Sequence, residues 1–104
     1  MRTITIQKTK QKNKRYKVTM EGFPNMDSHS HTFGSSTGKT YVDGATDKQK
    51  SAWYARHSVN KNFDSIYSPV FYSKSLLWNT NNLKKNIELL AKKLNSRIVV
   101  KGKL

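Results

Sequence analysis

The amino-acid sequence predicts a small single α+β domain over residues 1–104, with a short antiparallel sheet, an aromatic-rich middle and a C-terminal amphipathic helix. Three observations lead to this prediction. Two segments near the N-terminus alternate polar and apolar residues with the period of a strand. One segment near the C-terminus repeats apolar residues with the period of a helix. Between them, seven of the eleven aromatic residues lie in the stretch from Trp53 to Trp78.

The length and the composition exclude several classes of protein. A chain of 104 residues suits one domain with one modest core and is too short for a large enclosed active site. It contains no cysteine, so it can form neither a disulfide scaffold nor a thiolate zinc site. Its N-terminus lacks the apolar core of a signal peptide, and no stretch approaches the roughly 18 apolar residues of a membrane span. We therefore expect a soluble intracellular protein.

The first elements are strands. Arg2–Gln7 and Lys14–Met20 both alternate polar and apolar residues, as half-buried strands do. Lys8–Asn13 has no apolar residue and is expected to be an exposed loop. Residues 1–13 are therefore predicted to form a basic strand or arm.

The next segments lead from the strands to a helix. Glu21–Asp27 contains Gly, Pro, Asn and Asp and is predicted to be a turn or loop. A short strand at His29–Phe33 is expected to return beside the second strand. Gly34–Gly44 is rich in Gly, Ser and Thr and is expected to be irregular. Thr46 or Asp47 then caps a helix that runs to about residue 57, because a side-chain oxygen there can accept from the first-turn N–H groups.

Helical segments and one strand complete the predicted domain. Residues 58–72 are expected to be irregular, and Ser73–Trp78 to form a short helix. The clearest element is a helix at about Thr80–Leu94, which has one packing face and one basic face. Arg97–Val100 is β-branched and is predicted to be a last strand, beside the N-terminal one.

The positive charge is concentrated at the two ends of the chain. The formal net charge is +14, from 20 Lys or Arg against 6 Asp or Glu. Residues 1–20 carry seven bases and no acid, residues 82–104 seven bases and one acid, and residues 21–81 six bases and five acids. Clustered bases displace the counterions of a polyanion, so we expect a negatively charged partner. The alternative is that the lysines only keep the protein in solution or belong to a disordered arm.

The segment Gly34–Thr40, with the sequence Gly-Ser-Ser-Thr-Gly-Lys-Thr, is similar to a phosphate-binding loop. The working pattern needs four residues between the first Gly and the Gly-Lys-Thr, and here there are only three, with Phe33 at the required position. No nucleotide-binding α/β body follows. We therefore interpret the segment as a solvent-exposed turn.

Neither a metal site nor a catalytic site is predicted. His29, His31 and His57 are the only candidate cluster for a metal, and we interpret them as surface or hydrogen-bonded histidines. The six acids and many serines show no spacing that selects a nucleophile with its base. Nuclease activity is the remaining enzymatic alternative. The prediction is a non-enzymatic protein without cofactor or metal.

The aromatic cluster has two interpretations. Rings beside basic residues can stack on unpaired nucleotides, as they do in many single-strand binders. Large rings also bury the most area per residue, and aliphatic residues are scarce in this part of the chain. We favour a core. Trp78 and Phe71 are expected to be buried, and Tyr72 and Tyr41 to be surface rings.

The order of several motifs resembles a family of small, basic, uncharacterised proteins of large DNA viruses. The motifs are Phe33-Gly34, Asp43 in a turn, Tyr54-Ala-Arg-His57, the aromatic Phe63, and Ser68-Pro-Val-Phe-Tyr-Ser-Lys-Ser-Leu-Leu-Trp-Asn79. The resemblance covers about residues 14–94, and the Arg-His and Leu-Leu-Trp-Asn blocks carry most of it.

The chain departs from the family pattern at two places. Val70 stands where the family usually has Gly, and Ser-Ser-Thr-Gly is inserted before Asp43. The family has no established enzymatic role, so the resemblance implies a viral origin and association with a virion or genome. It also makes Arg56 and His57 candidates for a shared contact.

These observations lead to two hypotheses. In the first, the chain is a minor capsid or virion protein that contacts neighbouring virion proteins or packaged genome, and is soluble in the host cell before assembly. In the second, it is a free nucleic-acid-binding module that makes sequence-independent contacts to the DNA or RNA backbone. The candidate binding residues are Lys10, Lys12, Lys14, Arg15, Arg56, Lys84, Lys85, Lys92 and Lys93.

Overall fold

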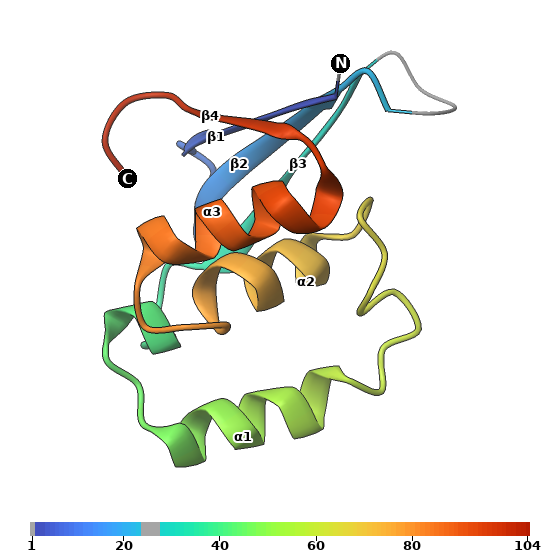
Figure 1. Ribbon diagram of the computed structural model, residues 1–104. Coiled ribbons are helices and arrows are strands. Elements are labelled where there is room, and N and C mark those ends of the chain that lie inside the picture. The colour runs from blue at the N-terminus through green and yellow to red at the C-terminus, as the bar shows by residue number, and fades with distance from the viewer. Residues whose placement is uncertain (1, 24–27) are drawn as a thin grey trace.

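The computed structural model describes residues 2–23 and 28–104. It confirms an α+β domain in which three strands are followed by helices and a last strand (Figure 1). The predicted turn at Glu21–Asp27 lies partly outside the described residues. The elements are β1 (Thr3–Lys8), β2 (Lys14–Glu21), β3 (Ser28–Ser35), the single 3-10 turn η1 (Tyr41–Asp43), α1 (Asp47–His57), α2 (Pro69–Tyr72), the π-helical turn η2 (Ser73–Leu77), α3 (Leu83–Leu94) and β4 (Arg97–Val100).

The four strands form one mixed sheet in the order β3-β2-β1-β4. β2 is antiparallel to β1 and to β3, as expected for a meander. β4 lies beside β1, as predicted, but the two are parallel, so the prediction of an antiparallel sheet is wrong at this edge. A parallel neighbour needs a long crossover connection, and all the helices lie in the connection between β1 and β4. β1 is therefore an internal strand, paired on both sides.

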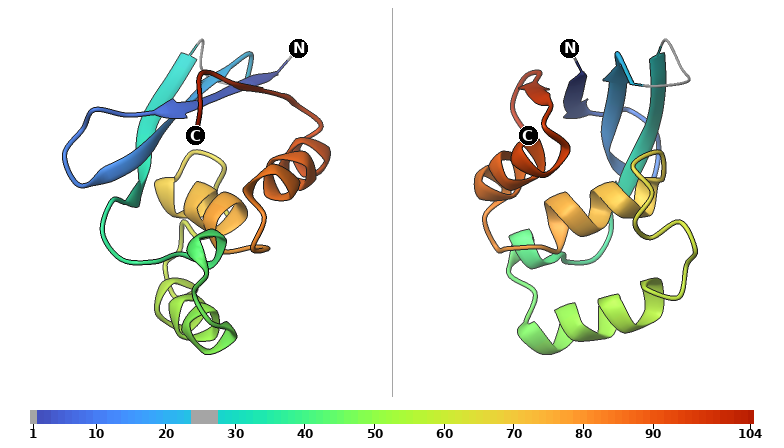
Figure 2. Two further views of the ribbon diagram at one scale, coloured as in Figure 1. Left: turned by 90° about the vertical axis from the view of Figure 1, so that its left-hand side faces the viewer. Right: turned by 45° about the vertical axis from the view of Figure 1, so that its right-hand side comes forward.

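One face of the sheet forms the core. Ile4 and Ile6 of β1, and Tyr16, Val18 and Met20 of β2, alternate with residues that are partly exposed on the opposite face. The segment α2–η2 and the helix α3 cover the buried face, and α1 lies on the far side of them from the sheet (Figures 1 and 2). The molecule is thus layered as sheet, middle helices and outer helix.

Local side-chain chemistry sets the ends of the two long helices. Thr46 caps α1 by accepting a hydrogen bond from the Gln49 backbone N–H at 3.1 Å, as predicted. The C-terminal helix begins at Leu83 rather than near Thr80, because Asn82 caps it by accepting from the Lys85 N–H at 3.0 Å. It ends at Leu94, as predicted, before the left-handed Asn95.

The segment expected to be irregular at residues 58–72 ends in a helix. Pro69 occupies the first turn of α2, where its fixed φ and missing N–H are tolerated. The predicted helix at Ser73–Trp78 then continues as η2 to Leu77. Because the helix starts earlier, Tyr72 faces the sheet and is fully buried, so its assignment as a surface ring is wrong. Phe71 and Trp78 are buried, as predicted.

Gly34 lies where the surrounding side chains leave no room for a Cβ atom. Its φ is +79°, and a Cβ there would lie 2.8 Å from Leu77 Cδ1 and 3.3 Å from Arg15 Cδ. Leu77 is fully buried and cannot move aside freely. Gly38 has nearly the same φ, +78°, but no atom within 4 Å of such a Cβ.

We expect Gly34→Ala to destabilise the fold more than Gly38→Ala. Both variants place Ala in the left-handed region at a cost of about 1 kcal/mol, and only Gly34→Ala adds an overpacking cost of about 1–3 kcal/mol. Urea denaturation of both variants and of the parent measures the two losses. Equal losses would show that Leu77 accommodates the new methyl group.

Candidate functional site

The structure places the predicted basic residues in two separate regions. Lys10, Lys12 and Lys14 belong to the β1–β2 hairpin. The four predicted lysines of the C-terminal segment are all exposed on α3. Figure 2 (left) shows the hairpin and α3 at opposite sides of the molecule. The predicted lysines of the hairpin and those of α3 therefore do not combine into one surface.

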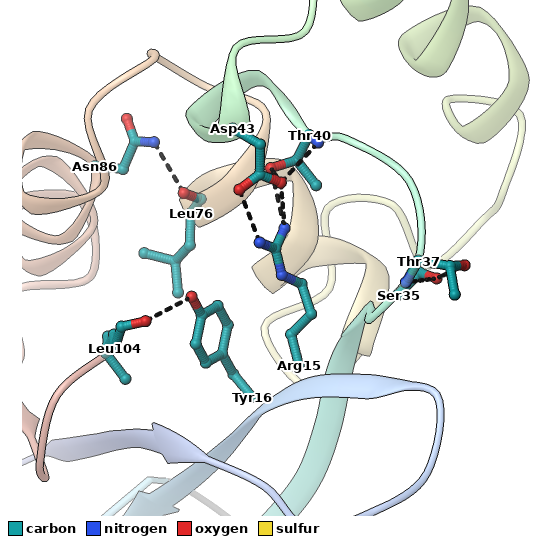
Figure 3. A network of polar contacts seen from close by, with 9 residues as sticks. All are labelled: Arg15, Tyr16, Ser35, Thr37, Thr40, Asp43, Leu76, Asn86 and Leu104. Atoms are coloured by element: carbon teal, nitrogen blue, oxygen red, sulfur yellow. Dashed lines mark hydrogen bonds and ion pairs between the residues drawn. The ribbon is translucent and has the colours of Figure 1, made fainter.

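Arg15, which the sequence suggested as a binding residue, is held in an ion pair. Its two terminal nitrogens lie 2.7 and 2.8 Å from the two carboxylate oxygens of Asp43. Asp43 also accepts hydrogen bonds from the backbone N–H and the hydroxyl of Thr40, both at 2.9 Å (Figure 3). The hydrogen bond from Arg15 is the main reason that the pKa of Asp43 lies well below its usual range. The same bond raises the pKa of Arg15.

This ion pair fixes the segment between β3 and α1 against the start of β2. Asp43 belongs to η1, and η1 leads within a few residues to the cap of α1. The loop before η1 is tied at its other end, because the Ser36 N–H donates to the Asn13 carbonyl of the hairpin at 3.2 Å. Within the loop, the hydroxyls of Ser35 and Thr37 are hydrogen bonded to each other at 3.0 Å (Figure 3). The loop is therefore held at both ends.

A cleft runs between this loop and α1. It consists of two adjoining cavities of about 230 and 380 Å³. We call these two cavities together the cleft. The residues that line both of them are Gly34, Ser35, Trp53, His57 and Ser73. The segment Gly34–Thr40, interpreted from the sequence as an exposed turn, thus forms one wall of the cleft.

Basic side chains from three segments converge on the cleft. Lys14 comes from the start of β2, Lys39 from the loop before η1, and Arg56 with His57 from the last turn of α1. None of the described residues that line the two cavities is an Asp or a Glu. Burial, and then the neighbouring Arg56, lower the pKa of His57. The cleft is therefore a concave region of positive charge.

The aromatic rings close the inner wall of the cleft. Trp53 stacks on Trp78 with ring centroids 5.2 Å apart and an angle of 15° between the planes, and each residue is only 7% exposed. His57 packs on Trp53 at 4.5 Å between centroids. These contacts attach α1 to the middle layer, together with the bond from Lys50 Nζ to the Asn79 carbonyl at 2.6 Å. The two tryptophans are core residues, as the favoured interpretation predicted.

The sequence identified only part of this site. Lys14 and Arg56 were among the predicted binding residues, and His57 was a candidate through the family resemblance. Lys39 was missed, because Gly34–Thr40 was rejected as a nucleotide-binding loop. The Gly-Lys-Thr spacing was the available signal for it. The structure agrees that the segment is not such a loop, since the three-residue η1 follows it in place of a long helix.

Other candidate sites are weaker. A second cavity of about 230 Å³ lies between α3 and residues 74–79, where Lys74 and Lys93 face it, but Lys74 is already paired with Asp64. Across residues 2–23 and 28–104, no three metal-ligating side chains are gathered closely enough to hold an ion. The histidine rings of His29 and His31 do meet on β3, 5.3 Å apart.

No helix in the described part of the chain has the length and apolar character needed to cross a bilayer. The chain matches no protein-family model, no curated protein and no solved structure.

We expect Asp43→Asn to lower the free energy of unfolding by about 1–2 kcal/mol at pH 7, because it breaks a partly exposed charged pair and its hydrogen bonds. The folded-state pKa of Asp43 is lowered, so its stabilising contribution is present above the ordinary pKa of 3.8 and declines as the pH falls below that value. The difference between variant and parent should therefore shrink in acid. Urea titrations at pH 7 and pH 3 measure it.

Asp64→Asn is the matched control. It removes the same charge from the pair with Lys74, in which the Asp64 side chain is 85% exposed. Exposed pairs contribute little to stability. An Asp43→Asn protein as stable as the Asp64→Asn protein at pH 7 would contradict a structural role for the Arg15–Asp43 pair.

Proposed function

We propose that this protein is a non-enzymatic binder of the nucleic-acid backbone, with the cleft as its principal contact. The observation that carries the proposal is that Lys14, Lys39 and Arg56 all line the cleft. None of the described residues that line its two cavities carries a carboxylate. Three segments far apart in sequence supply these cations. A purely solubilising role for the lysines gives no reason for them to gather around a cavity.

The chemistry of the cleft suits phosphate. Each Lys or Arg that meets a phosphate releases condensed counterions, which is the main sequence-independent source of affinity for nucleic acid. Hydroxyl groups also donate to phosphate oxygens, and Ser35 and Thr37 stand beside the cations. The inserted Ser-Ser-Thr-Gly segment therefore contributes polar contacts to the proposed site.

The closed inner wall favours backbone contacts over base stacking. A base can stack only on a ring with an open face, whereas Trp53 and Trp78 are covered by each other and by the core. We therefore propose that the protein makes little distinction between sequences. Stacking as a source of affinity is a weaker candidate for this cleft.

As a second candidate, we propose that the chain acts as a minor capsid or virion component and contacts neighbouring virion proteins as well as packaged genome. The family resemblance supports this candidate through the Tyr-Ala-Arg-His and Leu-Leu-Trp-Asn blocks. Arg56 and His57 of the first block line the cleft. In this proposal the protein is soluble in the host cell before it enters the virion.

Binding of DNA by the isolated protein is expected to fall steeply with salt. Each phosphate contact contributes about −0.9 to the slope of log K against log salt for duplex DNA. Lys39→Gln/Arg56→Gln should therefore reduce the slope by about 2. Fluorescence anisotropy with a 30-base-pair duplex, between about 50 and 200 mM salt, measures the slope. A second duplex of unrelated sequence should give the same affinity.

Lys48→Gln/Lys61→Gln is the control for this experiment. Both lysines are exposed, and neither lines the two cavities. If this pair reduced the slope as much as the cleft pair, the cleft would not be the contact. If the parent retained no duplex even at 50 mM salt, the proposed function itself would be wrong.

The second candidate is tested on purified particles. A virion component held by neighbouring proteins should remain with the shells after nuclease and salt have removed the genome. A protein held only by nucleic acid should leave with the genome. Quantitative mass spectrometry of the two fractions measures the distribution, and its absence from purified particles would contradict a virion role.

A further inference from the structure

A second basic surface lies on α3, away from the cleft. We call it the helix surface and define it by Lys84, Lys85, Lys92, Lys93 and Arg97. The four lysines lie on the exposed side of α3. Arg97 adjoins them, because it lines one open cavity together with Lys92. Glu88 is the carboxylate of α3, between Lys84 and Lys92 in sequence.

The cations of the helix surface are available to a partner. The described part of the chain contains two ion pairs, and neither involves a residue of this surface. Lys93 is the exception, because its Nζ lies 5.5 Å from the centre of the Phe71 ring and its side chain also lines the cavity between α3 and residues 74–79. The surface therefore keeps most of its charge unneutralised.

Helix stability does not explain the charges at the start of α3. Lys92 and Lys93 lie in the last turn, where cations complement the negative end of the helix dipole. Lys84 and Lys85 lie in the first turn, directly after the Asn82 cap, where a cation meets the positive end. Both lysines therefore lower the stability of α3. Because helix stability does not explain their position, a role in binding is favoured.

The geometry prevents one straight duplex from contacting both surfaces. The hairpin and the loop before η1 lie on one side of the molecule and α3 on the other (Figure 2). The extents of the molecule are 38 × 30 × 26 Å. DNA with a persistence length of about 150 base pairs does not wrap around so small an object without a substantial bending cost.

Two separate segments can nevertheless bind at the same time. Each extent of the molecule exceeds the Debye length of about 10 Å at 0.1 M salt, so the protein separates the segments by more than the range of their repulsion. Binding at one surface then raises the effective concentration of the second segment at the other.

We propose that a single copy of this protein bridges two segments of nucleic-acid duplex, one in the cleft and one on the helix surface. This inference rests on the proposed function of the cleft and adds a second, independent contact. It assigns a cross-linking role to the protein: it brings together duplex segments that are remote along the nucleic acid.

The test is a capture experiment with two duplexes. One 60-base-pair duplex is fixed to beads and saturated with protein, the excess is washed away, and a fluorescent second duplex is added at 50 mM salt. The parent protein should capture the second duplex. Lys39→Gln/Arg56→Gln and Lys84→Gln/Lys85→Gln should each still bind one duplex but lower the capture by about tenfold or more, because each pair removes about two phosphate contacts from one surface. Lys48→Gln/Lys61→Gln should capture as the parent does.

Lys84→Gln/Lys85→Gln is a clean variant, because it removes two cations from the positive end of α3 and so does not weaken the helix. If the parent bound the first duplex but captured no second one, bridging would be wrong while the proposed function stood. If both surface variants captured as well as the parent, the protein would bridge by self-association, and the single-copy proposal would be wrong. If the parent bound neither duplex, both proposals would fall.

Discussion

The ion pair between Arg15 and Asp43 is the contact on which the arrangement of the cleft depends. It joins the start of strand β2 to η1, and so connects the sheet to the segment that leads into the outer helix. Together with the hydrogen bond from Arg15 to the Thr40 hydroxyl at 3.2 Å, it ties the η1 end of the loop at 35–40 to the sheet, whereas the Ser36 N–H ties the β3 end. The pair is bidentate and is supported by two further hydrogen bonds from Thr40, which makes its geometry specific. Gly34 allows the close approach, because Arg15 and Leu77 occupy the space that a side chain would need.

A different interaction holds the other side of the cleft. α1 lies in the outer layer, on the far side of the middle helices from the sheet (Figure 1), and reaches the core through the ring of Trp53. The Trp53–Trp78 stack provides that contact. The loop after Trp78 is fixed in turn by Asn86, a fully buried amide that donates to the Leu76 carbonyl (Figure 3). Asn86 also donates to the Thr80 carbonyl and accepts from the backbone N–H and the hydroxyl of Thr80. The aromatic residues in the middle of the sequence therefore attach the outer helix α1 to the rest of the domain.

Local chemistry made much of the fold predictable. The alternation at Arg2–Gln7 and Lys14–Met20, the Thr46 cap and the apolar stripe of α3 all depend on neighbours in sequence, and the structure confirms them. The direction of β4 could not be predicted in the same way. Hydrophobic alternation is identical for parallel and antiparallel partners, and the choice depends on how the whole crossover is packed. The burial of Tyr72 was missed for a related reason, since it depends on a helix start at Pro69 that few local residues signal.

The cleft was beyond prediction because charge along the chain differs from charge in space. The middle of the sequence is nearly neutral when its residues are counted. In the fold, however, Asp43 is bound to Arg15, Asp64 to Lys74, and Asp47 accepts the hydroxyl of Tyr41. None of these three aspartates lines the cavities, whereas Lys39 and Arg56 of the same segment do. The nearly neutral charge of the middle segment therefore does not predict a positively charged cleft. The N-terminal basic segment adds Lys14 to this cleft, whereas the adjacent Arg15 is held in the ion pair with Asp43.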